Sequence, residues 1–187
     1  MRIIAGELKG ASIHMPNDKN TRPLKDLVRE SIFNILKHSN KLTFNIENSQ
    51  ILDLYAGSGS FGLECLSRKA KNVCFVEKYK HAVEVLEKNI QKLKVKKKTQ
   101  VFFSDIFKLQ KNNFNLQFDL IFCDPPFKER KTKELIDFFI KEHLLTNNSI
   151  IIFHREKNVE DNMHDNFKII EEKIYGLSKV IFGKCLV

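Results

Sequence analysis

The stretch Ile51-Leu52-Asp53-Leu54-Tyr55-Ala56-Gly57-Ser58-Gly59-Ser60-Phe61-Gly62 decides the fold. Its first four residues, apolar apart from one acid, indicate a buried strand, and residues 61–69 have the pattern of a helix. The glycines at 57, 59 and 62 match G-x-G-x-x-G, in which glycine permits a tight turn and close approach of the backbone to a ligand. A strand, a glycine-rich turn and a helix in this order predict the first unit of a doubly wound α/β sheet.

The same alternation continues toward the C-terminus. Further strands are expected at residues 72–76, 101–103, 120–123 and 149–153, and further helices at residues 79–93 and 132–145. Strands that alternate with helices indicate a mainly parallel sheet. Two last strand candidates, residues 167–175 and 180–186, have a connection too short for a helical crossover, which favours an antiparallel hairpin. We therefore expect a Rossmann-like, mainly parallel seven-stranded sheet with an antiparallel C-terminal hairpin.

The N-terminal part precedes this alternation. Residues 2–5 and 11–14 resemble two short strands of a hairpin, and a helical pattern runs from Leu27 to Leu36. Residues 40–49 are polar and rich in Asn, which is typical of a linker. We expect a hairpin and helix extension in residues 1–40 and the sheet domain in residues 41–187.

Composition restricts the class of protein. The chain has 187 residues, of which 42% are hydrophobic, enough for one globular core. No apolar run approaches the ~20 residues of a membrane span, and the N-terminus is charged too early for a signal peptide. The four cysteines form no C-x-x-C pair and lie in apolar contexts. They indicate buried free thiols rather than disulfides or a metal site, and hence a cytoplasmic protein.

The net charge of +9 makes a polyanionic partner plausible. The chain is, however, rich in Lys, Asn and Ile throughout, so a compositional bias explains the charge equally well. Charge alone does not identify nucleic acid as the partner.

Asp124-Pro125-Pro126-Phe127 follows an apolar run, residues 118–123, that indicates a buried strand. Neither proline can extend a strand ladder, so the pair predicts a rigid loop with backbone carbonyls available to a ligand. A carboxylate beside such carbonyls suits an exocyclic amine, which has two hydrogens to donate, and Phe127 suits stacking on the ring that carries the amine. The alternative is an ordinary turn after a core strand.

A second group of residues suits a cofactor. In addition to the loop residues Gly57, Ser58 and Gly59, Glu77 ends the second strand, where an acid can bond ribose hydroxyls. Asp53 just before the loop would attract a cationic methionyl amine or sulfonium and would repel a pyrophosphate, which favours S-adenosylmethionine over a dinucleotide.

The third strand ends in Ser104-Asp105-Ile106. This segment can bond an adenine amine through Asp105 and cover the ring through Ile106. Asp105 is equally well explained as a helix N-cap, and the two roles are compatible.

Together these motifs resemble, in order and spacing, the class I S-adenosylmethionine-dependent methyltransferases. The segments Arg2-Ile3-Ile4-Ala5-Gly6, Arg22-Pro23 and Val28-Arg29-Glu30-Ser31-Ile32-Phe33-Asn34-Ile35-Leu36 further resemble the RsmD-type 16S ribosomal RNA (guanine-N2)-methyltransferases. The resemblance covers nearly the whole chain and is looser after about residue 154. Leu27 stands where this family usually has an arginine, which puts any substrate contact of that arginine in doubt.

The resemblance implies methyl transfer from S-adenosylmethionine to the exocyclic N2 of a guanine, by a cytoplasmic monomer acting on 16S ribosomal RNA within a small-subunit particle. Asp124, Pro125 and Phe127 are then the expected catalytic residues. RNA contacts are expected from Lys9, Arg22 and Arg29 in the N-terminal extension. For Arg29, pairing with Glu30 on a helix face is the alternative.

Four other functions remain open at this point. They are adenine-N6 methylation of RNA or DNA, methylation of a glutamine amide, a non-catalytic RNA-binding role in assembly, and dinucleotide oxidoreduction. Asn usually replaces Asp124 in the glutamine-amide enzymes, and no hydride-transfer site accompanies the glycine loop.

Overall fold

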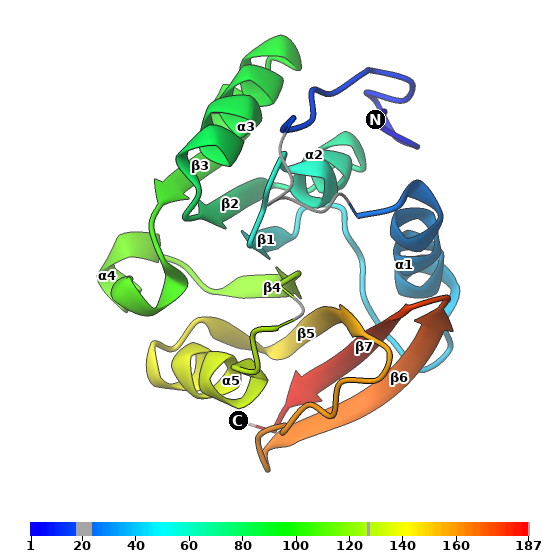
Figure 1. Ribbon diagram of the computed structural model, residues 1–187, viewed down its shortest axis with the longest axis vertical. Coiled ribbons are helices and arrows are strands. Elements are labelled where there is room, and N and C mark those ends of the chain that lie inside the picture. Colours follow the sequence, from blue (N-terminus) through cyan, green and yellow to red (C-terminus); the bar gives the residue numbers. More distant parts are fainter. Residues whose placement is uncertain (18–23, 127, 187) are drawn as a thin grey trace.

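The computed structural model describes residues 1–17, 24–126 and 128–186 (Figure 1). The helices are α1 (Asp26–His38), α2 (Ser60–Ser67), α3 (Lys80–Lys92), α4 (Lys111–Phe114) and α5 (Thr132–Lys141). The strands are β1 (Gln50–Leu54), β2 (Asn72–Glu77), β3 (Thr99–Phe103), β4 (Phe118–Cys123), β5 (Leu145–Glu156), β6 (Phe167–Tyr175) and β7 (Ser178–Cys185).

The seven strands form one sheet in the order β3-β2-β1-β4-β5-β7-β6. The first five strands in this order are parallel, and β7 runs antiparallel to both β5 and β6. The predicted mainly parallel sheet with an antiparallel C-terminal hairpin is therefore confirmed. From β1 the chain moves outward through β2 and β3 and then returns to β4 on the other side of β1. Ligands of open α/β sheets bind at such a reversal, beside the carboxyl ends of the strands.

Helices cover both faces of the sheet, with α1, α2 and α3 on one side and α4 and α5 on the other (Figure 1). Successive residues of a strand point to opposite faces. In β1, Ile51 accordingly packs with the α1–α3 layer and Leu52 with the α4–α5 layer. Both faces are covered, which explains why the parallel strands are near-continuous apolar runs that sequence patterns detect well.

Polar segments differ most from the prediction. The α4 helix and the 3-10 helices Lys96–Lys98 and Ile106–Lys108 were not predicted, because each is too short to show a helical period. The β5 strand begins at Leu145 instead of residue 149, and its added residues are mostly polar. There the Ser149 hydroxyl donates a 2.6 Å hydrogen bond to the Phe118 carbonyl, which ties this segment to β4.

The predicted N-terminal hairpin is present as a loop closed by one bridge, Arg2 to Ser12, rather than as two regular strands. It packs on the core through Ile3 and Ile13, which are both buried. Gly6 has a φ of +82°, and a Cβ atom there would lie 1.9 Å from the carbonyl oxygen of Ser67 at the end of α2. Only glycine fits this contact.

The segment predicted as a linker also packs against the core. Leu42 is buried, and Phe44 and Ile46 are partly buried against the same layer as α1. The polar, Asn-rich composition of this segment conceals these three apolar contacts. Described residues of the N-terminal extension and of the sheet belong to the same hydrophobic core.

All four cysteines are free and buried, as predicted. Burial raises the pKa of Cys74 to about 12 and that of Cys185 to about 11. Among the described residues, no helix combines the length and the apolar character that a membrane crossing requires.

A buried carboxylate attaches the N-terminal segment to α2. Glu64 is fully buried, and its two oxygens accept hydrogen bonds from the backbone N–H groups of Ile4 at 2.7 Å and Ala5 at 2.9 Å. The Arg68 Nε donates to the same carboxylate at 2.9 Å. Every partner would lose its acceptor if this side chain were truncated.

We predict that Glu64→Ala lowers the free energy of unfolding by about 1–3 kcal/mol, because it leaves the partly buried N–H groups of Ile4 and Ala5 without an acceptor. Urea denaturation of the purified variant measures this change. The control is Glu47→Ala, which removes an exposed ion pair with Lys69 and should cost less than about 1 kcal/mol. Equal costs for the two variants would contradict the role of Glu64.

Candidate active site

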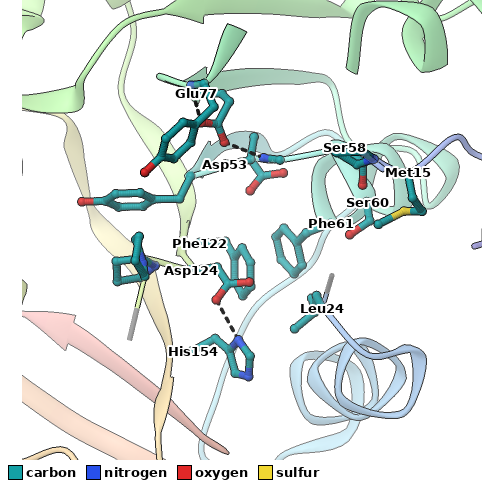
Figure 2. A pocket seen from close by; sticks show the side chains of 17 residues that line it. Met15, Leu24, Asp53, Ser58, Ser60, Phe61, Glu77, Phe122, Asp124 and His154 are labelled. Atoms are coloured by element: carbon teal, nitrogen blue, oxygen red, sulfur yellow. Dashed lines mark hydrogen bonds and ion pairs between the residues drawn. The ribbon is translucent and has the colours of Figure 1, made fainter. Parts of the chain in front are cut away.

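A cavity of about 250 Å³ opens at the carboxyl ends of β1, β2 and β4, where the strand order reverses (Figure 2). Four titratable side chains on its wall are Asp53, Glu77, Asp124 and His154. In each case the residue two positions earlier in the chain packs in the α1–α3 layer. Because side chains alternate between the two faces along a strand, all four side chains point to that side of the sheet. The fold thus brings residues from four strands to one cavity.

The three glycines of the loop have different roles. Gly57 has a φ of +55° and open space where a Cβ atom would be. Gly59 is the N-cap residue of α2 at a φ of +78°, and a Cβ atom there would lie 2.3 Å from Leu86 of α3. A Cβ atom at Gly62 would lie 2.4 Å from the Phe75 ring of β2. Of the three glycines, Gly57 therefore leaves room beside the cavity, whereas Gly59 allows close packing against α3 and Gly62 allows close packing of α2 on the sheet.

The Glu77 carboxylate holds the glycine loop against the end of β2. One of its oxygens accepts the Gly57 N–H at 2.8 Å, and the other accepts the N–H groups of Lys78 at 2.7 Å and Tyr79 at 2.8 Å. Glu77 is buried against this loop and lines the cavity. The predicted cofactor residue is thus also a structural anchor of the loop.

Asp53 accepts the N–H of Gly62 at 2.9 Å and is only 2% exposed. Burial is the main cause that raises the pKa of this carboxyl well above its usual range. The Gly62 N–H opposes this rise, and the nearby carboxylates of Asp124 and Glu77 add to it. The Glu77 and Asp124 carboxylates on the same cavity favour a cationic ligand.

Ser58 is buried beside the cavity, and its carbonyl oxygen accepts a 3.0 Å hydrogen bond from the Asn89 side chain. Asn89 also bonds the backbone of His14 in both directions, at 2.7 and 3.0 Å. It connects the glycine loop, α3 and the N-terminal segment, and the sequence analysis missed it. A lone polar residue among Ala82, Leu86 and Ile90 on the apolar face of α3 was the available signal.

Asp124 follows β4 directly and forms a 2.8 Å hydrogen bond with Nδ1 of His154 at the end of β5 (Figure 2). Pro125 and Pro126 line the same cavity. The structure therefore brings the Asp124 loop beside the glycine loop, as the order of the motifs predicted. Phe127, the predicted stacking residue, lies outside the described residues.

The loop after Asp124 is anchored through Glu129. The Tyr55 hydroxyl donates to the Glu129 carboxylate at 2.5 Å, and Arg155 donates to the Glu129 carbonyl at 2.6 Å. Burial raises the pKa of Tyr55. Arg155 is fully buried and pairs with Asp161 at 2.7 Å, so it neither approaches a substrate nor is solvated.

Asp105 caps the 3-10 helix at Ile106 by accepting the Phe107 N–H at 3.1 Å, which confirms the N-cap interpretation. It also pairs with Lys78 at 3.7 Å. A small hollow that shares Tyr55 and Glu77 with the main cavity is lined by Ser104, Asp105 and Ile106. The expected contact of Asp105 and Ile106 with adenine stays a prediction.

The outcome differs among the three candidate RNA contacts. Arg29 is 0% exposed, and its guanidinium donates to the Arg2 carbonyl at 2.6 Å and to Asp26 at 3.0 Å. Its desolvation, only partly offset by Asp26, lowers the pKa of the guanidinium. The predicted phosphate contact of Arg29 is therefore wrong, and so is its pairing with Glu30. Lys9 is exposed on the N-terminal loop, and Arg22 lies outside the described residues.

Comparisons with known proteins find a matching family and relatives that cover most of the chain. The family model described as "Conserved hypothetical protein 95" matches residues 1–184. Ribosomal RNA small subunit methyltransferase D of Haemophilus influenzae is 34% identical over 95% of this chain and 90% of its own length. The protein of the same name in Escherichia coli strain K12 is 31% identical over 94% of this chain and 85% of its own length.

The solved structure of the yhhF protein of Escherichia coli has a TM-score of 0.84 and 28% sequence identity, and the match covers 100% of this chain and 98% of that chain. The family model, the sequence relatives and the solved structure thus match the chain over most or all of its length. The chain belongs to the "Conserved hypothetical protein 95" family, which is the RsmD family that its motifs resemble.

Proposed function

We propose that this protein transfers a methyl group from S-adenosylmethionine to the exocyclic N2 of a guanine in 16S ribosomal RNA. The observation that carries the proposal is the shared cavity, in which Asp124 and its prolines face the glycine loop and Glu77. An acceptor suited to an amine and a pocket suited to a cationic methyl donor lie at one edge of the sheet. The sequence relatives are named as methyltransferases of small-subunit ribosomal RNA, which supports RNA as the substrate.

The lining of the cofactor half of the cavity suits S-adenosylmethionine by its chemistry. The donor carries a sulfonium and an ammonium group, and Asp53 would attract these charges near the open face of Gly57. Glu77 would bond the ribose, and Asp105 with Ile106 would bind the adenine in the adjoining hollow. When bound, the cofactor supplies an electrophilic methyl group on sulfur.

The substrate half of the cavity would align the guanine amine with the methyl group. The N2 amine of guanine is a poor nucleophile, because its lone pair is delocalised into the ring, and its hydrogens become acidic only as the N–C bond forms. Asp124 and the Pro125 carbonyl would accept hydrogen bonds from the two amine hydrogens, which directs the lone pair toward the methyl group. As the N–C bond forms, the methyl–sulfur bond would break, and the proton released from nitrogen would pass to the Asp124 carboxylate. Holding the reacting atoms in line lowers the entropic part of the barrier. Phe127 would stack on the guanine ring.

The N-terminal extension, residues 1–40, would contact the RNA. Lys9 on its exposed loop and Arg22 are the proposed phosphate contacts, and such contacts weaken steeply as salt rises. An adenine-N6 activity would use the same acceptors. The resemblance of the N-terminal motifs to the RsmD-type enzymes supports guanine, and identification of the methylated nucleoside separates the two activities.

We predict that Glu77→Ala weakens binding of S-adenosylmethionine at least about 10-fold, because the variant loses the acceptor that fixes the Gly57 N–H. Isothermal titration calorimetry measures the affinity. Glu84→Ala on the exposed face of α3 is the matched control and should bind like the wild type. Unchanged affinity in Glu77→Ala would show that the carboxylate does not organise the cofactor site.

We predict that Asp124→Ala lowers methyl transfer at least about 100-fold while cofactor affinity survives, because the variant loses alignment and keeps the glycine loop. The assay supplies labelled methyl donor to small-subunit particles and identifies the product nucleoside. Glu134→Ala on α5 is the control, since its side chain is exposed away from the cavity lining. Normal turnover by Asp124→Ala would remove the carboxylate from the reaction.

A further inference from the structure

His154 has a defined place beside the proposed amine acceptor. The parallel pairing of β4 and β5 places Cys123 opposite Phe153, so the next residues, Asp124 and His154, meet where the two strands part. His154 is 6% exposed, and the Asp124 side chain is 20% exposed on the cavity wall. Their 2.8 Å contact joins Nδ1 of the imidazole to Oδ1 of the carboxylate.

The chemistry of this contact fixes its direction. An ionised carboxylate only accepts hydrogen bonds, so Nδ1 of His154 carries the hydrogen whenever Asp124 is charged. A carboxylate has two oxygens with about four lone-pair sites, and the bond to His154 occupies one of them. Because Asp124 lines the cavity, its remaining acceptor sites are available to a ligand there.

A fixed carboxylate suits the proposed reaction, because an amine hydrogen needs an acceptor oxygen at a defined position. Asp53 and Glu77 line the same cavity. The residue opposite His154 on β7 is the apolar Val180, and Tyr55 and Tyr79 are the other titratable groups of the lining.

We propose that His154 is a positioning residue for Asp124. Its Nδ1–H holds one carboxylate oxygen and leaves the other oxygen to accept a hydrogen bond from the amine. This inference rests on the methyl transfer proposed above and adds a residue from β5 to it.

Two substitutions distinguish the effect of losing the hydrogen-bond donor from the effect of losing the imidazole ring. His154→Leu removes the donor and keeps an apolar side chain, whereas His154→Asn retains an N–H close to the position of Nδ1 and does not titrate. We expect the kcat of the Leu variant to fall about 10–100-fold, with cofactor affinity within about twofold of wild type. The acid limb of its pH–rate profile should move to higher pH, because loss of a donor disfavours an ionised carboxylate.

The Asn variant should recover most of the kcat and the wild-type acid limb. His81→Leu, at an exposed position on α3, is the histidine control and should behave like wild type. Thermal unfolding and calorimetry with S-adenosylmethionine verify that each variant is folded. If the Leu variant does not fold, the Asn variant alone tests the proposal, and near-wild-type turnover by the Asn variant supports it.

Two outcomes would overturn the positioning role while the wild type transfers methyl groups. One is a Leu variant with unchanged kcat and pH profile, and the other is a folded Asn variant as impaired as the Leu variant. Absence of transfer by the wild type itself would instead refute the proposed function, and this inference with it. The two failures are therefore distinguishable in one set of assays.

Discussion

The hydrogen bonds that the Glu77 carboxylate accepts from three backbone N–H groups are the interaction on which the site depends. They fix the glycine loop at the end of β2, next to the point where the strand order reverses. Asp53 adds a second attachment, from β1 to the start of α2. Buried acids in these positions are costly unless hydrogen-bonded, and the loop N–H groups meet that need. The same bonds that stabilise the loop therefore leave its open face, at Gly57, beside the cavity.

The second half of the site uses the adjoining strands. Asp124 and His154 meet because β4 and β5 are parallel and in register. The partly buried network of Glu129, Tyr55 and Arg155 attaches the loop after Asp124 to β5 and to the end of β1. The geometry of the proposed amine acceptor is thus set by the sheet rather than by the loop alone.

The sheet could be predicted because its strands are buried on both faces and are read directly as apolar runs. The cofactor loop and the Asp124 loop could be predicted because each is a contiguous motif. The partnership of Asp124 with His154 spans 30 residues, and the burial of Arg29 depends on docking of the N-terminal segment. Such contacts arise only from tertiary packing, which local patterns do not contain. Arg29 was misjudged for this reason, since a charged residue on a helix is usually solvated.

The most direct measurement is mass spectrometry of 16S ribosomal RNA from cells that lack this protein. We predict that one N2-methylguanosine is missing and that it returns with the wild-type chain but not with Asp124→Ala. An unchanged set of N2-methylguanosines, or loss of a methylated adenine instead, would contradict the proposal that this cavity presents guanine N2 to the methyl donor.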